Sequence, residues 1–259
     1  MEYGLIGERL GHSYSKLIHE RLADYRYELC PLTRAEFIRF MEKRDFKAIN
    51  VTIPYKKAVL SYLDELDESA ESIGAVNTIV NRDGKLIGYN TDYLGFLYML
   101  KYFGIDPAGK KVLVLGTGGA SAAVRAAFYN LEVGKLLTVS RTPCCADEIS
   151  YEDAARECRD VQIICNTTPV GMYPDVNASP LSLAPFKNCE AVVDVIYNPG
   201  ETLLVKEAKS LGIKGVTGLM MLVAQAKYAC ERFTGTALSD DVIEPIYRDL
   251  AALMYEGKR

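Results

Sequence analysis

Short apolar runs alternate along the chain with stretches whose apolar residues recur at helical spacing. Runs such as Tyr3–Ile6 and Val112–Leu115 are typical of buried strands, and the segments between such runs predict helices. This alternation predicts βαβ units, and therefore an α/β fold with mainly parallel sheets. Asp83-Gly84, which joins two alternating runs, predicts a hairpin turn. The expected strands are Tyr3–Ile6, Tyr27–Cys30, Ala48–Thr52, Val76–Val80, Lys85–Tyr89, Val112–Leu115, Leu136–Val139, Val161–Cys165, Ala191–Val195 and Lys214–Val216.

The helical pattern is interrupted once in a way that predicts a domain boundary. The segment Gly104–Lys110 breaks the pattern with Gly, Pro and Lys, and Gly and Pro commonly interrupt helices and strands. A second set of alternating strands and helices follows it. The expected helices are Ser15–Asp24, Arg34–Lys43, Asp92–Phe103, Ala120–Asn130, Thr202–Leu211, Leu219–Phe233 and Asp240–Tyr255.

Composition narrows the class of protein. The net charge of -4 and the pI near 5.4 argue against a nucleic-acid-binding protein, which would carry a basic surplus. No apolar run approaches the ~20 residues that cross a bilayer, and Met1–Gly7 reads as a strand, so we expect neither a membrane span nor a signal peptide. The seven cysteines lack CxxC spacing, and two histidines are available, which argues against a zinc site and favours free thiols in a reducing cytoplasm.

A glycine-rich turn follows the strand Val112–Leu115 and opens a helix. Gly116-Thr117-Gly118-Gly119-Ala120 lets the backbone approach a pyrophosphate closely, and the helix N-terminus offers free N–H groups with a partial positive charge. Ser121 replaces the third glycine of the usual pattern. A tight βα turn without a ligand is the alternative, but the strand–turn–helix context favours dinucleotide binding.

The strand that follows ends in Ser140-Arg141-Thr142. An NAD site usually has Asp or Glu at this place to bind the ribose 2′-hydroxyl. Arg141 with two neighbouring hydroxyls suits a 2′-phosphate instead, through charge-assisted hydrogen bonds. A solvated loop arginine is the alternative, yet together with the glycine turn this segment favours NADP.

Polar side chains also recur at the ends of the strands predicted in the first hundred residues. Ser13 and Ser15, Lys56, Asn77, and Asp92 lie in four such segments. Each has an ordinary alternative, such as a helix N-cap for the serines and Asp92 or a solvated lysine. In open α/β sheets, however, ligands bind beyond the carboxyl ends of strands, and these groups would suit a small polyhydroxylated acid.

In their order, these segments resemble the shikimate dehydrogenase family over essentially the whole chain. Several motifs in sequence make the match far more specific than a lone glycine turn. The matching segments are His12–Ser15, Asn50–Lys56, Gly74–Thr78, Gly88–Gly95, Gly116–Ala120, Ser140–Thr142, Asn166–Met172, Asp194–Pro199 and Gly218–Gln225.

The resemblance implies an NADP-dependent oxidoreductase that reduces 3-dehydroshikimate to shikimate in chorismate biosynthesis. Ser13 and Ser15 would hold the substrate carboxylate, and Lys56 and Asp92 would lie at the reacting centre. The other residues expected around the ring hydroxyls are Thr52, Asn77, Tyr197 and Gln225. The residues expected to line the cofactor are Gly116, Thr117, Gly118, Gly119, Ala120, Ser140, Arg141, Thr142, Val195, Gly218 and Met221, with Glu68 as a further one.

The family also implies a cofactor domain inserted into the substrate domain. We therefore expect a discontinuous substrate-binding domain over residues 1–103 and about 222–259, and an NADP-binding domain over residues 104–221. The closing helix, Asp240–Tyr255, should then pack on the first domain. The sequence leaves the oligomeric state open, with a homodimer as one alternative.

Departures from the family pattern leave some alternatives open. Lys16 stands where the family often has proline, Cys145 replaces a second basic residue, and Ala122 lacks the basic side chain common after the glycines. Use of both NAD and NADP therefore stays open, as does a quinate or quinate/shikimate dehydrogenase. A non-catalytic dinucleotide-sensing module is the alternative from another class, against which the Lys56 and Asp92 pair argues.

Overall fold

A computed structural model describes residues 1–11 and 13–256, so His12 lies outside the described residues. The chain forms two compact units. The first contains Met1–Gly95 and Leu222–Tyr247, and the second contains Phe96–Met221 and the chain from Arg248 onward. Within the described part of the chain, no helix combines the length and the apolar character needed to cross a bilayer.

The first unit is built on a six-stranded sheet in the order β2-β1-β3-β5-β6-β4. β1 pairs in parallel with β2 and β3, and β4 with β6, whereas β5 is antiparallel to both of its neighbours. The predicted Asp-Gly hairpin is confirmed, because Asp83 (φ 53°) and Gly84 (φ 89°) both adopt the positive φ that a tight β5–β6 turn requires. The strands are β1 (Tyr3–Gly7), β2 (Tyr27–Pro31), β3 (Ala48–Val51), β4 (Glu65–Leu66), β5 (Thr78–Arg82) and β6 (Lys85–Tyr89).

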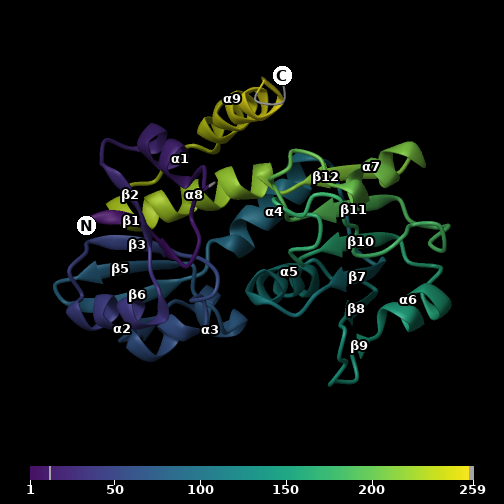
Figure 1. The fold of residues 1–259 in the computed structure, drawn as a ribbon, viewed down its shortest axis with the longest axis horizontal. Helices are drawn as coiled ribbons and strands as arrows, with labels where there is room; N and C mark the ends of the chain where they lie inside the picture. The colour runs from purple at the N-terminus through teal and green to yellow at the C-terminus, as the bar shows by residue number, and fades with distance from the viewer. Residues whose placement is uncertain (12, 257–259) are drawn as a thin grey trace. The chain divides into compact units, whose positions relative to one another are not determined.

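Helices cover both faces of this sheet. Figure 1 shows α2 and α3 on one face and α1 and α8 on the other. The alternation of side chains along β1 sends Ile6 into the core with Phe37 and Met41 of α2, and Leu5 into the core with Phe233 of α8. The helices with residues in this unit are α1 (Ser15–Leu22), α2 (Arg34–Lys43), η1 (Ala58–Tyr62), α3 (Glu68–Ile73), α4 (Asp92–Tyr102), α8 (Leu219–Thr234), η2 (Asp240–Val242) and α9 (Ile243–Glu256).

The second unit contains a six-stranded sheet in the order β12-β11-β10-β7-β8-β9, with every pairing parallel. The chain adds β8 and β9 on one side of β7 and then β10, β11 and β12 on the other side. This is the doubly wound arrangement, with a topological switch point beside β7. The elements are β7 (Lys111–Leu115), α5 (Gly119–Asn130), β8 (Lys135–Val139), β9 (Glu148–Ile149), α6 (Tyr151–Glu157), β10 (Ile163–Asn166), β11 (Ala191–Asp194), α7 (Leu203–Ser210) and β12 (Lys214–Thr217).

The α/β fold predicted from the alternating pattern is confirmed. The central strands of the second unit are buried on both faces, which is why they read as continuous apolar runs in the sequence. The elements that the pattern did not predict, η1, β4, α3, β9 and α6, are too short to produce a periodic signal. The closing helix, observed as η2 and α9, has residues in both units, so its packing on the first domain stays a prediction.

His19 is a fully buried titratable side chain in the core of the first unit. Its ring stacks on the rings of Tyr27 and Phe233, at 4.2 and 5.5 Å between ring centroids. The His19 Nδ1 lies 2.7 Å from the Tyr25 hydroxyl oxygen. Complete burial lowers the pKa of His19 from 6.5 to about 3. The folded chain therefore holds a neutral imidazole over a pH range in which the unfolded chain holds a proton.

We predict that His19 makes the folded state less stable as pH falls from about 6.5 towards 3. Because the unfolded state binds the extra proton in this window, the free energy of unfolding should fall by up to about 1.4 kcal/mol per pH unit. Urea unfolding followed across this range in the wild type and in His19→Phe measures the effect. The difference between the two slopes isolates His19, and parallel slopes would contradict the prediction.

Candidate active site and cofactor site

A lysine–aspartate pair lies at one edge of the first sheet. Lys56 follows β3 and Asp92 begins α4, directly after β6. The Lys56 Nζ lies 2.5 Å from Asp92 Oδ2, and the two side chains are only 16% and 9% exposed. An ion pair in so sheltered a place interacts more strongly than one in water, because less solvent screens it.

Asn77 holds the other oxygen of this carboxylate. Its Nδ2 donates to Asp92 Oδ1 and to Thr91 Oγ1, both at 3.0 Å, and lies 3.4 Å from Gln225 Oε1. Its Oδ1 accepts from the Thr91 backbone N–H at 2.8 Å. With Lys56 on one oxygen and Asn77 on the other, the Asp92 carboxylate has a defined orientation.

The direction of β5 explains why these groups meet. Asn77 comes immediately before β5, so it lies at the amino end of a strand and not at a carboxyl end as its motif had suggested. Because β5 is antiparallel to β3 and β6, its amino end lies beside their carboxyl ends. The Asn77 carbonyl accepts from Val51 N at 2.8 Å, its N–H donates to Tyr89 O at 3.1 Å, and Val76 N donates to Lys56 O at 2.9 Å.

Further buried polar groups support Asn77. Asn50 Nδ2 donates to the Asn77 carbonyl at 3.2 Å and to Thr78 Oγ1 at 3.0 Å, while its Oδ1 accepts from the Tyr27 hydroxyl at 2.7 Å. Asn90 Oδ1 accepts from the Asp92 backbone N–H at 3.1 Å. The sequence analysis assigned no role to Asn50, Thr78, Asn90 or Tyr27. The first three lie within two positions of an expected site residue, whereas nothing in the sequence links Tyr27 to the site.

The two serines of the first motif lie together at the start of α1. Ser13 Oγ donates to Ser15 Oγ at 3.1 Å and accepts from Ser15 N at 3.3 Å. The N-cap residue is Tyr14, whose side chain makes no capping bond, so neither serine caps the helix in the usual way. Thr52 lies over the backbone of Gly7, where an added Cβ would come within 2.5 Å of Thr52 Cγ2.

The glycine turn of the second unit joins β7 to α5. Gly116 adopts φ +100°, and a Cβ there would lie 2.8 Å from Thr168 Cγ2, so glycine is required. Gly118 is the N-cap of α5, and no side chain caps this end of the helix. A Cβ on Gly118 would meet nothing within 4 Å. Ser121 Oγ donates to Gly116 O at 2.6 Å, which closes the turn that the third glycine usually shapes.

This arrangement fits the diphosphate of a dinucleotide. The backbone at Gly118 is open, Thr117 is exposed, and Gly119 and Ala120 form the first turn of α5. The uncapped N–H groups and the positive end of the helix dipole both favour a phosphate. The turn also lies at the carboxyl end of β7, the switch point of the sheet.

The segment after β8 carries the predicted arginine. Ser140 Oγ accepts from Thr142 N at 3.2 Å, which fixes the turn around Arg141. The Arg141 side chain is exposed, and no described residue forms a hydrogen bond or an ion pair with it. A guanidinium in this position is available for an anion such as a 2′-phosphate.

The remaining expected residues fall at separate places. Gly218 packs against Val195, since a Cβ on Gly218 would lie 2.0 Å from the Val195 carbonyl oxygen. Met221 is buried in the first turn of α8. Tyr197 also belongs to the second unit, and Glu68 is an exposed residue at the start of α3 in the first unit.

Asp194 supports the segment that contains Val195 and Tyr197. Its Oδ1 accepts from Asn166 Nδ2 and Ile196 N, both at 3.0 Å, and its Oδ2 accepts from Thr202 Oγ1 at 2.8 Å. Burial raises the pKa of this carboxyl to about 6, against the opposing effect of these bonds. The sequence motif contained Asp194, but nothing in it indicated that the side chain points into the core.

The doubly wound sheet, the open glycine turn and the free arginine define the second unit as a dinucleotide-binding fold, joined in this chain to a unit with a sheltered Lys–Asp pair. The family description "Shikimate dehydrogenase substrate binding domain" matches residues 5–79. A shikimate dehydrogenase (NADP(+)) of Caldanaerobacter subterraneus subsp. tengcongensis is 37% identical over 263 residues, covering 93% of this chain and 94% of that protein. The chain belongs to the shikimate dehydrogenase family.

Solved structures agree with this membership. Shikimate dehydrogenase 1 from Peptoclostridium difficile has a TM-score of 0.91 and 36% identity, covering 98% of this chain and 99% of that chain. The enzyme from Thermus thermophilus, solved in complex with NADP(H) and shikimate, has a TM-score of 0.85 and 33% identity, covering 96% and 99%.

Replacement of Asp194 should destabilise the second unit. Asp194→Ala would leave the side chains of Asn166 and Thr202 and the Ile196 N–H buried without their acceptor, so we expect a loss of about 3 kcal/mol or more in the free energy of unfolding. Denaturant unfolding measures this loss. Asp175→Ala, at an exposed position, is the matched control and should change stability by less than about 0.5 kcal/mol. Equal effects of the two substitutions would contradict the prediction.

Proposed function

We propose that the chain catalyses the reversible, NADPH-dependent reduction of 3-dehydroshikimate to shikimate, a step towards chorismate and the aromatic amino acids. The observation that carries the proposal is the Lys56–Asp92 pair, held at one edge of a sheet by a buried amide network. Support also comes from two relatives that are named shikimate dehydrogenase (NADP(+)). Their similarity covers more than nine-tenths of this chain.

Lys56 is the proposed acid and base at the reacting oxygen. As a ketone is reduced, negative charge develops on its oxygen and must be stabilised and then protonated. An ammonium group can do both, and a positioned acid or base typically contributes ~10²–10⁴ in rate. Asp92 orients Lys56 through Oδ2, and in the reverse reaction Lys56 takes the proton from the hydroxyl.

Bound NADPH supplies the hydride that reduces the ketone carbon. The residues proposed to hold it are those of the glycine turn from Gly116 to Ala120, together with Ser140, Arg141 and Thr142. The N–H groups of the first turn of α5 would bind the diphosphate, and Arg141 would bind the 2′-phosphate. We also propose Val195, Gly218, Met221 and Glu68 as cofactor-lining residues, on the strength of the family resemblance alone.

The polar side chains of the first unit are proposed to bind the carboxylate and the hydroxyls of the substrate. Ser13 and Ser15 would donate to the carboxylate, since a pair of adjacent hydroxyls offers two donors to one anion. Asn77 and Gln225 would hydrogen-bond the ring hydroxyls close to Asp92. Thr52 and Tyr197 join them by family resemblance.

The work would then be divided between a substrate-binding domain, proposed over residues 1–103 and about 222–259, and an NADP-binding domain, proposed over residues 104–221. The two compact units instead divide the chain between Gly95 and Phe96. The proposed compartment is the cytoplasm, in keeping with seven cysteines that are all free thiols. The proposal needs no second copy of the chain to supply a residue, and it is compatible with a monomer or a homodimer.

Loss of the lysine tests the mechanism. We expect Lys56→Ala to lower kcat by roughly 10²-fold or more, because the charge on the substrate oxygen loses its proton donor. Shikimate should still bind with similar affinity through its other contacts. The absorbance of the reduced nicotinamide measures kcat with shikimate and, in a separate assay, with quinate as the alternative substrate. Calorimetry measures binding.

Lys57→Ala is the matched control, because Lys57 is the neighbouring lysine and its side chain is exposed. It should leave kcat unchanged, and a thermal melt of each variant checks folding. If Lys56→Ala kept a normal kcat and lost affinity instead, Lys56 would be a binding group and the mechanism would be wrong. A wild-type chain that oxidised quinate in preference to shikimate would overturn the proposed substrate.

Cofactor choice depends on Arg141. A hydrogen bond to a charged group contributes roughly 1.5–3 kcal/mol, so Arg141→Ala should lower kcat/KM for NADP by about 10- to 150-fold and leave NAD nearly unaffected. Arg159→Ala removes another exposed arginine of the same unit and should change neither value. Equal losses with both cofactors would show that Arg141 does not read the 2′-phosphate.

A further inference from the structure

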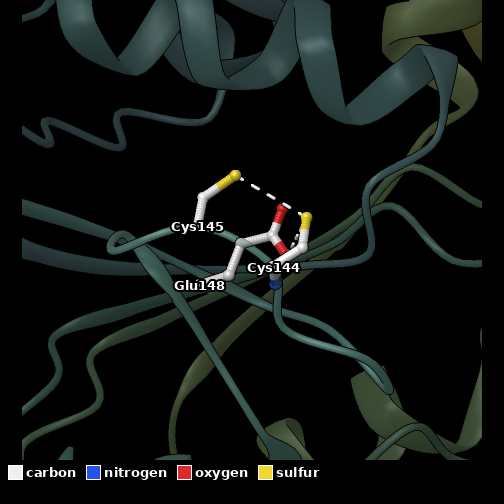
Figure 2. A group of neighbouring side chains, drawn as sticks. All are labelled: Cys144, Cys145 and Glu148. Carbon is white, nitrogen blue, oxygen red and sulfur yellow. Dashed lines mark hydrogen bonds between the residues drawn. The ribbon is translucent and has the colours of Figure 1, made fainter.

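Two adjacent cysteines on the loop between β8 and β9 lie close to a glutamate at the start of β9. Figure 2 shows Cys144, Cys145 and Glu148 with their polar ends turned towards one another. The two Sγ atoms are 3.6 Å apart, and Cys144 Sγ lies 3.5 Å from Glu148 Oε2. One ligand atom from each of the three residues lies within 4.8 Å of the other two.

Two of these three separations, the one between the two sulfurs and the one between Cys144 and Glu148, match the edges of a zinc coordination shell. Tetrahedral zinc with Zn–S bonds of about 2.3 Å and Zn–O bonds of about 2.0–2.2 Å places two sulfurs about 3.8 Å apart and a sulfur and an oxygen about 3.5 Å apart. Two of the three donor pairs are thus already near the spacing that the cation would impose. Binding would require movement mainly between Cys145 Sγ and the Glu148 carboxylate.

The loop is braced on both sides of the cluster. The Cys144 backbone N–H donates to Glu148 Oε2 at 3.0 Å, which orients the carboxylate, and Glu148 N donates to Cys145 O at 3.0 Å, which closes the turn. Asp147 pairs with Arg125 of α5 at 2.5 Å, and its carbonyl accepts from Thr138 N at 2.9 Å. Both thiols are exposed, so a cation can reach them from solvent.

We propose that Cys144, Cys145 and Glu148 form a site for a thiophilic divalent cation, zinc in the first place, with water at the fourth position. The two S–H bonds break as the two Zn–S bonds form, and both protons pass to solvent. The two positive charges of the cation thereby replace two protons, so the charge of the site does not change. The chemistry is that of a three-ligand zinc site that keeps one coordination position open.

This site is independent of the function proposed above, because it uses none of the residues assigned to substrate or cofactor.

The test uses the full chain without a histidine tag, stripped with a chelator and kept reduced by a phosphine. Calorimetric titration with zinc chloride should show one ion per chain, and titration with cadmium chloride should produce the ultraviolet thiolate-to-metal band. The double substitution Cys144→Ser and Cys145→Ser should raise the zinc Kd by at least roughly 100-fold. Loss of a group that only supports a ligand typically raises the Kd by about 10- to 100-fold, and loss of two ligands should raise it by more. Glu148→Gln should raise it by roughly tenfold or more and leave the cadmium band in place.

Cys30→Ser is the matched control, since Cys30 is a partly exposed thiol in the first unit, and it should leave zinc binding unchanged. Melting temperatures without metal establish that each variant is folded, and Glu148→Gln carries the test if the double variant is not. The proposal is overturned if the wild type binds no zinc at micromolar concentrations. It is equally overturned if zinc binds unchanged to a folded double variant or to Glu148→Gln.

Discussion

The orientation of one buried amide, Asn77, is the constraint on which the candidate active site depends. Its backbone joins the ends of β3 and β6, and its side chain connects Asp92 with Thr91. An unpaired polar group in this place would cost about 1–3 kcal/mol, so the network is stable only when every member has its partner. The same bonds that satisfy Asn77 therefore also set the direction of the Asp92 carboxylate and, through it, of Lys56.

The support for this amide extends far from the reacting pair. Asn50 lies between Asn77 and Tyr27, and Tyr27 in turn stacks on the buried ring of His19. Hydrogen bonds from Asn77 through Asn50 to Tyr27, and the stack of Tyr27 on His19, thus link the candidate site to the core of the first unit. Asp194 has the corresponding position in the second unit, where a buried carboxylate joins the ends of β10 and β11 to the start of α7. In both units, buried polar groups position the segments that follow the strands.

The two proposed sites of the second unit differ in what holds them. The glycine turn is shaped by the backbone, because Gly116 needs a positive φ and Gly118 leaves the helix end open. The Cys144, Cys145 and Glu148 cluster is shaped by side chains on a short turn that an ion pair from Asp147 to Arg125 secures. Backbone sites suit phosphates, which accept N–H groups, whereas thiolates suit soft cations.

The sequence by itself determined the α/β fold class, the hairpin at Asp83-Gly84, the glycine turn and the family. Each of these depends on local patterns, namely alternation, positive-φ turn residues and motif order, which are written along the chain. Only the tertiary structure decided that β5 also pairs with β3, in the antiparallel direction, and this brings Asn77 to the edge where Lys56 and Asp92 meet. It also decided that Tyr27 and Asn50 support the site, that Asp194 is buried, and that Glu148 joins the two cysteines. These facts depend on contacts between segments that lie apart in the chain or on the path of a single turn, and neither spacing nor periodicity records them.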